Sequence, residues 1–357
     1  MQLAAVRRAA PFLAVALTSL FMACTDAIGP DATSGPEAAA AKARKKQPAP
    51  APTPTPTPTP PPPDLSNPLI GMSLYVNPSS HAALQASDWR TTRPADALQM
   101  DKIAAQPAAK WFGNWNTDVR ADVDRAVSNA SVIGTVPVLV AYNIPQRDCG
   151  GYSSGGSNNP DGYRTWITAF ANGIGARHAI VILEPDALAG MDCLSATDQA
   201  TRSSLIGYAV NTLRALGATA VYIDAGHSHW HSASTMATRL TNANVATANG
   251  FSLNVSNFYY TSEQATYGDA ISSLVGGKHY VIDTSRNGLG SAGDSQWCNP
   301  DGRALGDRPT TATGYALADA FLWVKIAGES DGACNGNPAA GTWMPEYALG
   351  LAQRASY

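Results

Sequence analysis

The sequence predicts an α/β fold, a distorted TIM-like (β/α) barrel with parallel strands, and three observations carry this prediction. Short apolar segments alternate with helix-like segments from residue 69 onward. The apolar segments are nearly continuous, as in parallel strands that are buried on both faces. About eight strand–helix units favour a barrel over an open doubly wound sheet. A Gly-x-Gly-x-x-Gly turn does not follow the first strand, so a dinucleotide-binding fold has no support.

The expected strands are apolar runs rich in β-branched and aromatic residues. The segment 197–217 is expected to be a helix because Leu205, Ala209 and Leu213 share one helical face. The segment 238–250 is similar, and Gly250 is expected to end it. In chain order, the strands are expected at 69–76, 109–115, 136–145, 179–186, 220–227, 250–258, 279–287 and 321–329.

Residues 1–23 have the features of a secretory signal peptide. Arg7 and Arg8 precede an apolar stretch of about 15 residues, which is short for a membrane span. Cys24 follows directly, as in bacterial lipoprotein signals, where this cysteine carries the lipid. Ordinary secretory cleavage nearby is the alternative. We therefore expect an exported protein, either extracellular or held at the cell surface through a lipidated Cys24.

Two low-complexity segments come next. Residues 24–46 are rich in alanine, and residues 47–63 repeat proline and threonine, which is typical of an extended linker. The folded part is then 64–357, one domain of a size usual for an α/β barrel. Six of the 24 Lys and Arg and three of the 27 Asp and Glu precede it, which leaves the domain a net charge of −6. That sign argues against a nucleic-acid partner, and we expect a monomer.

The cysteine content supports export. If Cys24 is set aside, four of the five cysteines remain, namely Cys149, Cys193, Cys298 and Cys334. In an exported chain, four cysteines indicate two disulfides. Three pairings are open, and the sequential one is the most local. A Cys-x-x-Cys spacing does not occur in the sequence, so a zinc or redox site is disfavoured.

Polar side chains follow almost every predicted strand at its C-terminal end. In a (β/α) barrel these ends meet at one face, where active sites are built. A lone Asp or Asn after a strand is usually a helix cap, but capping alone does not explain six clusters on successive strands. The clusters are Tyr142, Arg147 and Asp148; Glu184 and Asp186; Asp224 and His227; Asn254, Ser256 and Asn257; Asp283 and Arg286; and Lys325, Glu329 and Asp331.

The histidines raise the alternative of a metal-dependent hydrolase. His227, His229 and His231 follow one strand, and a catalytic zinc needs three ligands at one point. His178 and His279 precede their strands and so belong to the opposite mouth of the barrel. A serine nucleophile on a Gly-x-Ser-x-Gly turn between a strand and a helix, as in serine hydrolases, has less support still. We expect neither a metal nor another cofactor.

Aromatic residues accompany the carboxylates. Trp111, Trp230 and Trp297 lie at or just after strand ends, with Tyr142 near them. Flat rings present an apolar face on which the apolar face of a sugar can stack, while charged and amide side chains hydrogen-bond the hydroxyls. Paired carboxylates with such rings indicate glycoside hydrolysis, in which a carboxylic acid with a raised pKa protonates the leaving group.

Seven segments, taken together and in order, resemble glycoside hydrolase family 6, whose members are cellulases that cut β-1,4-glucan with inversion of configuration. The resemblance covers residues 68–357. The segments are YNIPQRDC (142–149), ILEPDALA (182–189), YIDAGHSHW (222–230), FSLNVSNF (251–258), VIDTSRNG (281–288), WCNPDGRALG (297–306) and LWVKIAGESDG (322–332).

The resemblance implies a role for each matching residue. Asp186 would be the general acid, and Asp148 would raise the pKa of that acid. Asp331 would be the base that acts on water, through a water chain. Tyr142 would crowd the distorted sugar, and Ser154 would position water. The resemblance also implies substrate binding by Trp111, Asp224, His227, Trp230, Asn254, Trp297, Lys325 and Glu329, a structural role for Glu184, and the pairing Cys149–Cys193 and Cys298–Cys334.

The loops within both cysteine spans look short, which favours an open cleft and cutting within the glucan chain. The expected activity is therefore that of an inverting endo-β-1,4-glucanase. The alternatives are an exo-acting cellobiohydrolase and a non-catalytic glucan-binding surface lipoprotein. The three aspartates Asp148, Asp186 and Asp331 argue against a pure binding protein, because binding alone needs no acid and base.

Overall fold

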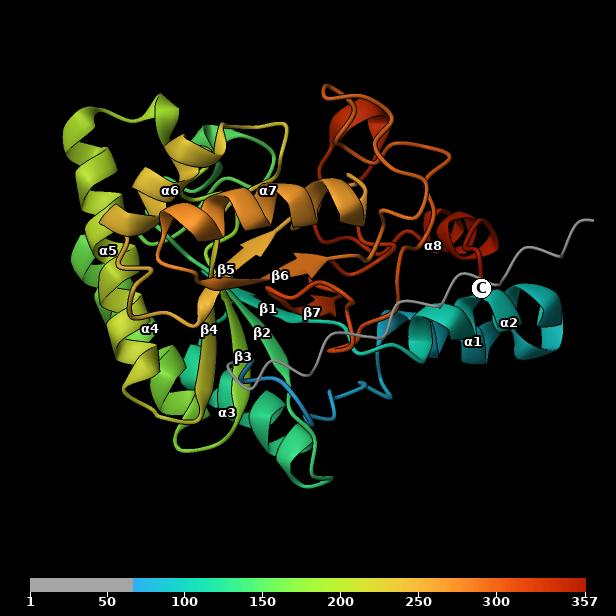
Figure 1. Ribbon diagram of the computed structural model, residues 1–357. Helices are drawn as coiled ribbons and strands as arrows, with labels where there is room; N and C mark the ends of the chain where they lie inside the picture. Colours follow the sequence, from blue (N-terminus) through green and yellow to red (C-terminus); the bar gives the residue numbers. More distant parts are fainter. Residues whose placement is uncertain (1–66) are drawn as a thin grey trace, which may run out of the picture. The chain divides into compact units, whose positions relative to one another are not determined.

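The computed structural model describes residues 67–357 (Figure 1). The predicted signal peptide, the segment with Cys24 and the Pro/Thr linker lie outside the described residues. Residues 67–357 contain one seven-stranded parallel sheet whose strand order follows the sequence. Among them, no helix is long and apolar enough to cross a membrane. The strands are β1 (Lys110–Gly113), β2 (Val138–Tyr142), β3 (Ala179–Leu183), β4 (Thr219–Asp224), β5 (Gly250–Leu253), β6 (His279–Asp283) and β7 (Ala318–Leu322).

The sheet curls so that its two outer strands approach each other. The N–H of Ala109, just before β1, donates to the carbonyl oxygen of Trp323, just after β7, at 2.9 Å. This contact is an isolated parallel bridge between Ala108 and Trp323 rather than a continuous ladder. The predicted distorted (β/α) barrel is confirmed, with a narrow seam between β1 and β7.

The expected first strand, 69–76, is wrong. Only Leu74 forms a bridge, to Val136, and the sheet has seven strands instead of eight. Gly71 adopts a left-handed conformation with φ +79°, which starts the segment on a turn. Pro78 follows closely and cannot donate a ladder hydrogen bond. The apolar side chain of Leu69 is nevertheless fully buried, so the apolar run reflects core packing and not a strand.

The helices follow the strands as predicted, with one wrong boundary. The expected helix at 197–217 is α5, and Ser195 caps it by accepting a hydrogen bond from the Asp198 N–H. The expected helix at 238–250 starts earlier and ends earlier, as α6, and Gly250 is instead the first residue of β5. The helices are α1 (His81–Thr92), α2 (Pro94–Ala104), α3 (Val119–Ser131), α4 (Pro160–Ile174), α5 (Ala196–Arg214), α6 (Ala233–Asn242), α7 (Thr261–Leu274) and α8 (Pro345–Gln353).

Both faces of the sheet are buried, which explains the nearly continuous apolar strands. Along β2, Leu139 and Ala141 point outward into the layer shared with α3 to α7, which surround the sheet in Figure 1. Val138 and Val140 point inward and pack against inner residues of other strands. This alternation has the period of two that strands impose. A further cluster joins α1, α2 and α8 around the buried Trp323.

Both predicted disulfides are present. Cys149 pairs with Cys193, and Cys298 pairs with Cys334. Each bond ties a loop that follows one strand to the loop that follows a later element. The sequential pairing implied by the family resemblance is therefore confirmed.

Left-handed backbone gathers at the C-terminal strand ends. Asp148, Glu184, Asp186 and Asn254 all have φ between 51° and 66°. Residues other than glycine rarely adopt this conformation, and when they do they concentrate at functional sites, where the surrounding contacts hold them. The turns at this face therefore orient side chains in ways that strand periodicity does not predict.

Candidate active site

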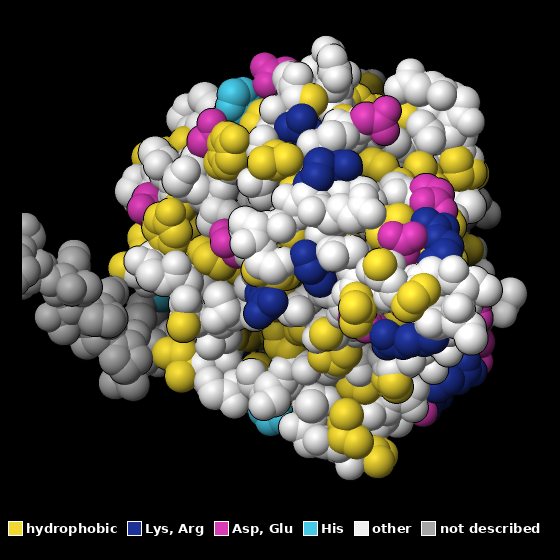
Figure 2. All heavy atoms as spheres, turned by 90° about the vertical axis from the view of Figure 1, so that its right-hand side faces the viewer, with side chains coloured by type: hydrophobic (Ala, Val, Ile, Leu, Met, Phe, Trp, Pro, Cys, Tyr) yellow, Lys and Arg dark blue, Asp and Glu magenta, His cyan; other side chains and the backbone are white. Residues whose placement is uncertain are grey.

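A cleft of about 980 Å³ lies at the C-terminal ends of the strands. Residues that follow all seven strands contribute to it, as expected for a barrel of this type. Figure 2 shows that the face on the right of Figure 1 is hollowed, with hydrophobic side chains inside the hollow. The predicted site residues that line the cleft are Trp111, Tyr142, Asp148, Ser154, Asp186, His227, Trp230, Trp297, Lys325, Glu329 and Asp331.

Asp224 does not line the cleft, and its predicted contact with substrate needs correction. The side chain is fully buried. Oδ1 accepts hydrogen bonds from the Asp186 N–H at 2.9 Å and the Gly226 N–H at 3.0 Å, and Oδ2 accepts one from the Ser252 hydroxyl at 3.1 Å. Asp224 therefore has no surface to offer a sugar. It supports the turn that carries Asp186 from behind.

Asn254 also lies beneath the cleft, fully buried, and needs the same correction. Its amide nitrogen donates to the carbonyl oxygens of Tyr259 at 3.2 Å and Asp283 at 2.9 Å. Its Oδ1 accepts from the Tyr259 N–H at 3.2 Å. Asn254 thus joins the loops after β5 and β6. Its left-handed backbone turns the side chain under the site instead of into it.

Asp186 lies at the cleft wall in an environment that disfavours its charge. Burial raises its pKa well above the ordinary value, and the negative charges of Asp224, Asp148 and Asp331 raise it further. Burial also raises the pKa of Asp224, to about 7, but three hydrogen-bond donors oppose that shift. Within residues 67–357 no N–H or O–H group donates a hydrogen bond to the Asp186 carboxyl, so Asp186 is the carboxyl that keeps its proton. After burial, the negative charge of Asp224 contributes most to the raised pKa of Asp186.

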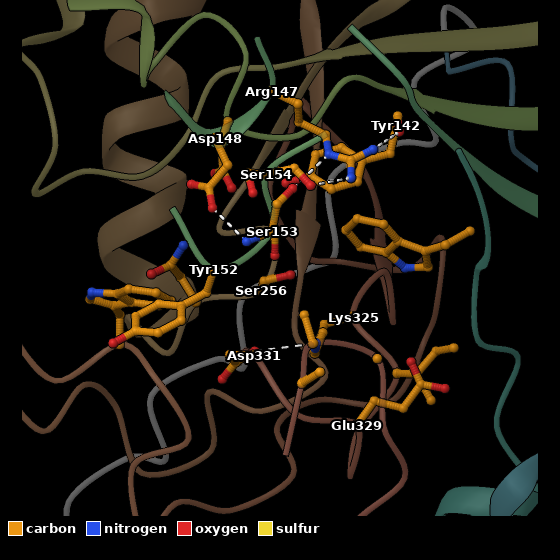
Figure 3. Close-up of a pocket in the computed structure, with 18 of the residues that line it drawn as sticks. Tyr142, Arg147, Asp148, Tyr152, Ser153, Ser154, Ser256, Lys325, Glu329 and Asp331 are labelled. Atoms are coloured by element: carbon orange, nitrogen blue, oxygen red, sulfur yellow. Dashed lines mark hydrogen bonds and ion pairs between the residues drawn. The ribbon is translucent and has the colours of Figure 1, made fainter. Parts of the chain in front are cut away.

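A buried arginine holds the loop that carries Asp148. Arg147 donates to the carbonyl oxygens of Tyr142 at 2.6 Å, Ser153 at 2.8 Å and Ser154 at 3.2 Å. Its guanidinium also lies over the Tyr142 ring, 4.3 Å from the centroid, as Figure 3 shows. Asp148 in turn accepts from the Ser153 N–H at 2.7 Å. Arg147 therefore fixes Asp148 and Ser154 relative to the end of β2.

Asp331 has the opposite environment to Asp186. Oδ2 is 2.9 Å from the Arg286 guanidinium and 3.0 Å from the Asn299 N–H, and Oδ1 is 3.2 Å from the Lys325 ammonium. Burial works against ionisation, but the charges of Arg286 and Lys325 outweigh it and lower the pKa of Asp331. Figure 3 shows Asp331 and Asp148 on different walls of the same cleft. Asp331 is therefore ionised where Asp186 is protonated.

Glu184 is buried below the site, as the sequence predicts. Its carboxylate accepts hydrogen bonds from the N–H groups of Asn143 and Ile144, each at 2.9 Å. Burial raises its pKa to about 7, against these two donors. The side chain ties the end of β3 to the chain that leaves β2.

Aromatic rings line the cleft between the carboxylates. The Trp111 ring meets the Tyr142 ring edge-on, with centroids 5.2 Å apart, and its Nε1 donates to the Val324 carbonyl oxygen at 2.8 Å. Trp230 lies beside His227, with ring centroids 5.4 Å apart. These contacts hold the rings in place before any ligand arrives. Rigid aromatic surfaces of this kind suit flat, weakly polar ligand faces.

The loops after β2 and β6 approach each other, which qualifies the expectation of an open cleft. The Tyr152 ring lies 6.0 Å from the Trp297 ring, centroid to centroid. Tyr152 also packs on Gly332, where even a methyl side chain would collide with it. The loop after β2 therefore packs against the loops after β6 and β7, and Figure 3 shows Tyr152 at a height between Asp148 and Asp331.

The three histidines after β4 do not point to a common centre. The His229 ring nitrogen lies 3.1 Å from Asp294, and that of His231 lies 3.3 Å from Asp192. Burial lowers the pKa of His227 to about 4, so this ring is neutral at physiological pH. Within residues 67–357, no group of three or more His, Cys, Asp or Glu side chains is arranged to hold a metal ion.

The family model for glycosyl hydrolases family 6 matches residues 69–355. The chain belongs to this family. Curated relatives include Endoglucanase A of Cellulomonas fimi, 46% identical over 286 residues that make up 79% of this chain and 61% of that protein. Endoglucanase 1 of Streptomyces halstedii is 41% identical over 286 residues, 77% of this chain and 86% of that protein. The chain thus spans only about three fifths of the length of the Cellulomonas relative.

Solved structures of the family agree with the fold. The endoglucanase Cel6 from Mycobacterium tuberculosis, solved with methyl-cellobiosyl-4-deoxy-4-thio-β-D-cellobioside, has a TM-score of 0.78 and 49% identity, and the match covers 82% of this chain and all of that chain. Endoglucanase Cel6B from Humicola insolens has a TM-score of 0.72 and 28% identity, with 81% and 98% covered.

Among the Trp, Tyr, Asp and Glu side chains that line the cleft of this family 6 chain, sequence reasoning missed four, namely Trp115, Tyr152, Tyr259 and Asp294. They lie in loops that follow strands, several residues past the strand ends. The pattern of polar residues at strand ends could not find them. The sequence contains one weak indication of Trp115, because it is a second tryptophan only four residues after Trp111.

Proposed function

We propose that the chain is an inverting endo-β-1,4-glucanase that hydrolyses cellulose or related β-glucans. The proposal rests on family membership and on one observation at the site. Asp186 and Asp331 line the same cleft, while their surroundings move their pKa values in opposite directions. Two carboxyl groups with separated pKa values are the acid and base that glycoside hydrolysis needs.

The reaction follows from these two states. Protonated Asp186 donates its proton to the glycosidic oxygen as the bond to the anomeric carbon breaks. The sugar acquires oxocarbenium character, and the negative charges of Asp148 and Asp331 stabilise it. Water attacks from the opposite face. Once the new C–O bond forms, that water becomes strongly acidic, so even a carboxylate with a lowered pKa such as Asp331 can accept its proton, directly or through a second water.

Endo action is supported by the relatives. The bacterial proteins most similar among those described above are named endoglucanases. More distant relatives, at 28% identity, are named probable cellobiohydrolases. Endo action requires that the middle of a glucan chain can enter the cleft, so the contact between Tyr152 and Trp297 must not close the cleft over the chain. Export, and attachment to a membrane through a lipidated Cys24, remain part of the proposal on the grounds of sequence.

The test is digestion of carboxymethyl cellulose. For endo action, we expect the viscosity to fall early, before much reducing sugar appears, because each internal cut shortens the polymer. Release of cellobiose with nearly constant viscosity would contradict endo action and favour a cellobiohydrolase. Binding without any reducing sugar would contradict hydrolysis and favour a glucan-binding protein. A strong chelator should leave the rate unchanged.

A further inference from the structure

Trp115 is a large aromatic side chain at the cleft that the proposed mechanism does not use. It lies on the turn between β1 and α3, lines the cleft, and is 52% exposed. Tryptophan usually buries most of its surface. An indole that stays open to a ligand cleft is therefore a candidate for ligand contact.

The position of the ring follows from the geometry of β1. Trp111 and Gly113 are two residues apart on a strand, so their side-chain positions face the same way, toward the cleft. Gly113 has no side chain, and a Cβ there would lie only 2.3 Å from Cζ3 of Trp115. The Trp115 indole therefore fills the place that a residue 113 side chain would take. The indoles of Trp111 and Trp115 therefore lie one after the other along this wall. Strand positions 111 and 113, which the two indoles occupy, are about 7 Å apart because each residue of a strand rises about 3.3 Å.

The ring is supported by buried groups. The Arg147 guanidinium lies over it, 5.4 Å from the ring centroid, and Arg147 is itself only 5% exposed. Arg147 also donates to Oδ1 of Asn114, in the same turn as Trp115, at 3.2 Å. The turn and the loop after β2 thus hold each other. A ring that is held before the ligand arrives loses little side-chain freedom on binding.

We propose that Trp115 is an additional sugar-binding platform, which stacks on one glucosyl unit of a β-glucan at the outer side of Trp111. The inference rests on the proposed function and extends it to a longer binding cleft. The exposed indole face is apolar and matches the axial C–H face of a β-linked glucosyl ring. Hydroxyl groups on the rim of that ring stay in water, so the platform adds affinity with little selection among β-glucans.

The first test is kinetic and uses cellohexaose. For Trp115→Ala we expect kcat/KM to fall about tenfold, mainly through a higher KM, which corresponds to about 1.4 kcal/mol. Trp115→Phe, which keeps an apolar ring, should recover most of the loss. Tyr208→Ala is the matched control, since Tyr208 is an exposed aromatic on α5 outside the cleft, and it should behave as the wild type. A lower kcat at unchanged KM would mean that Trp115 only supports the Arg147 loop, and would overturn the proposal.

The second test measures binding without turnover. Cellohexaose is titrated by calorimetry onto the Asp186→Asn chain, with and without Trp115→Ala, and we expect the Kd to rise about tenfold on loss of the indole. Equal Kd values would overturn the platform even if the wild type hydrolyses glucan. A wild type that binds through Trp115 but never hydrolyses would overturn the proposed function alone. A chain that binds no cellohexaose would overturn both.

Discussion

Asp186→Asn should lower kcat on an unactivated β-glucan by about 10²–10⁴-fold, the usual contribution of a general acid. The amide has the size of the carboxyl group but cannot deliver a proton to the glycosidic oxygen. Binding of cellohexaose should persist, because the aromatic rings of the cleft are unchanged. Steady-state rates on a soluble β-glucan, together with a binding titration, check both expectations.

A substrate with a good leaving group provides the control. When a dinitrophenyl β-cellooligosaccharide is cleaved, the dinitrophenolate leaves as a stable anion and needs little proton donation. The Asp186→Asn variant should therefore lose far less activity on this substrate than on glucan. Equal losses on both substrates would contradict the role of acid and would indicate a general disruption of the site.

Asp224→Asn tests how the pKa of the acid is set. Asp186 acts while protonated, so activity is lost as pH rises through its pKa. After burial, the Asp224 charge is the largest cause that raises this pKa. Removing the charge should lower the pKa of Asp186 and move the alkaline limb of the kcat/KM profile to lower pH. An alkaline limb at the wild-type pH would show that Asp224 has no electrostatic part in catalysis.

Asp331→Asn should damage both activity and stability. Arg286 is fully buried and depends on Asp331 for its ion pair. Breaking a buried pair from one side costs about 3–5 kcal/mol of unfolding free energy. Loss of the base should lower kcat by about 10²–10⁴-fold. Denaturant unfolding and rates on soluble glucan, measured at a temperature where the variant is folded, separate the two effects.

Azide distinguishes the two roles of Asp331. In an inverting site that lacks its base, a small anion can attack the anomeric carbon without deprotonation. For Asp331→Ala we expect azide to raise the rate and to yield an α-glycosyl azide. A folded variant whose rate does not respond to azide would show that Asp331 anchors the charges of Arg286 and Lys325 and is not the base.

Most strands, and the presence of Asp148, Asp186 and Asp331 at the cleft, could be predicted because they depend on local patterns. The apolar runs of β2 and β3 are buried on both faces, and polar residues at their ends mark the mouth of the barrel. The same dependence on local apolar pattern made the strand prediction for residues 69–76 wrong. Its apolar residues pack in the core, but nothing in their pattern records that the ladder with Val136 stops after one bridge.

The direction of a side chain after a strand could not be predicted. Asp186 follows β3 and Asp224 ends β4, yet Asp186 faces the cleft and Asp224 is buried behind it. The difference arises from the left-handed turn at Asp186 and from hydrogen bonds between two loops, which are distant in sequence. Trp115 escaped prediction for a similar reason, because its place depends on the missing side chain of Gly113.

The anomeric form of the first product tests the central claim, inverting hydrolysis driven by Asp186 and Asp331, most directly. Proton NMR during the first minutes of cellohexaose hydrolysis distinguishes the anomers before they interconvert. Direct attack of water opposite the leaving group predicts that the new reducing end appears as the α-anomer. Initial formation of the β-anomer would contradict the account, because it would require a covalent intermediate and a nucleophile in place of the base.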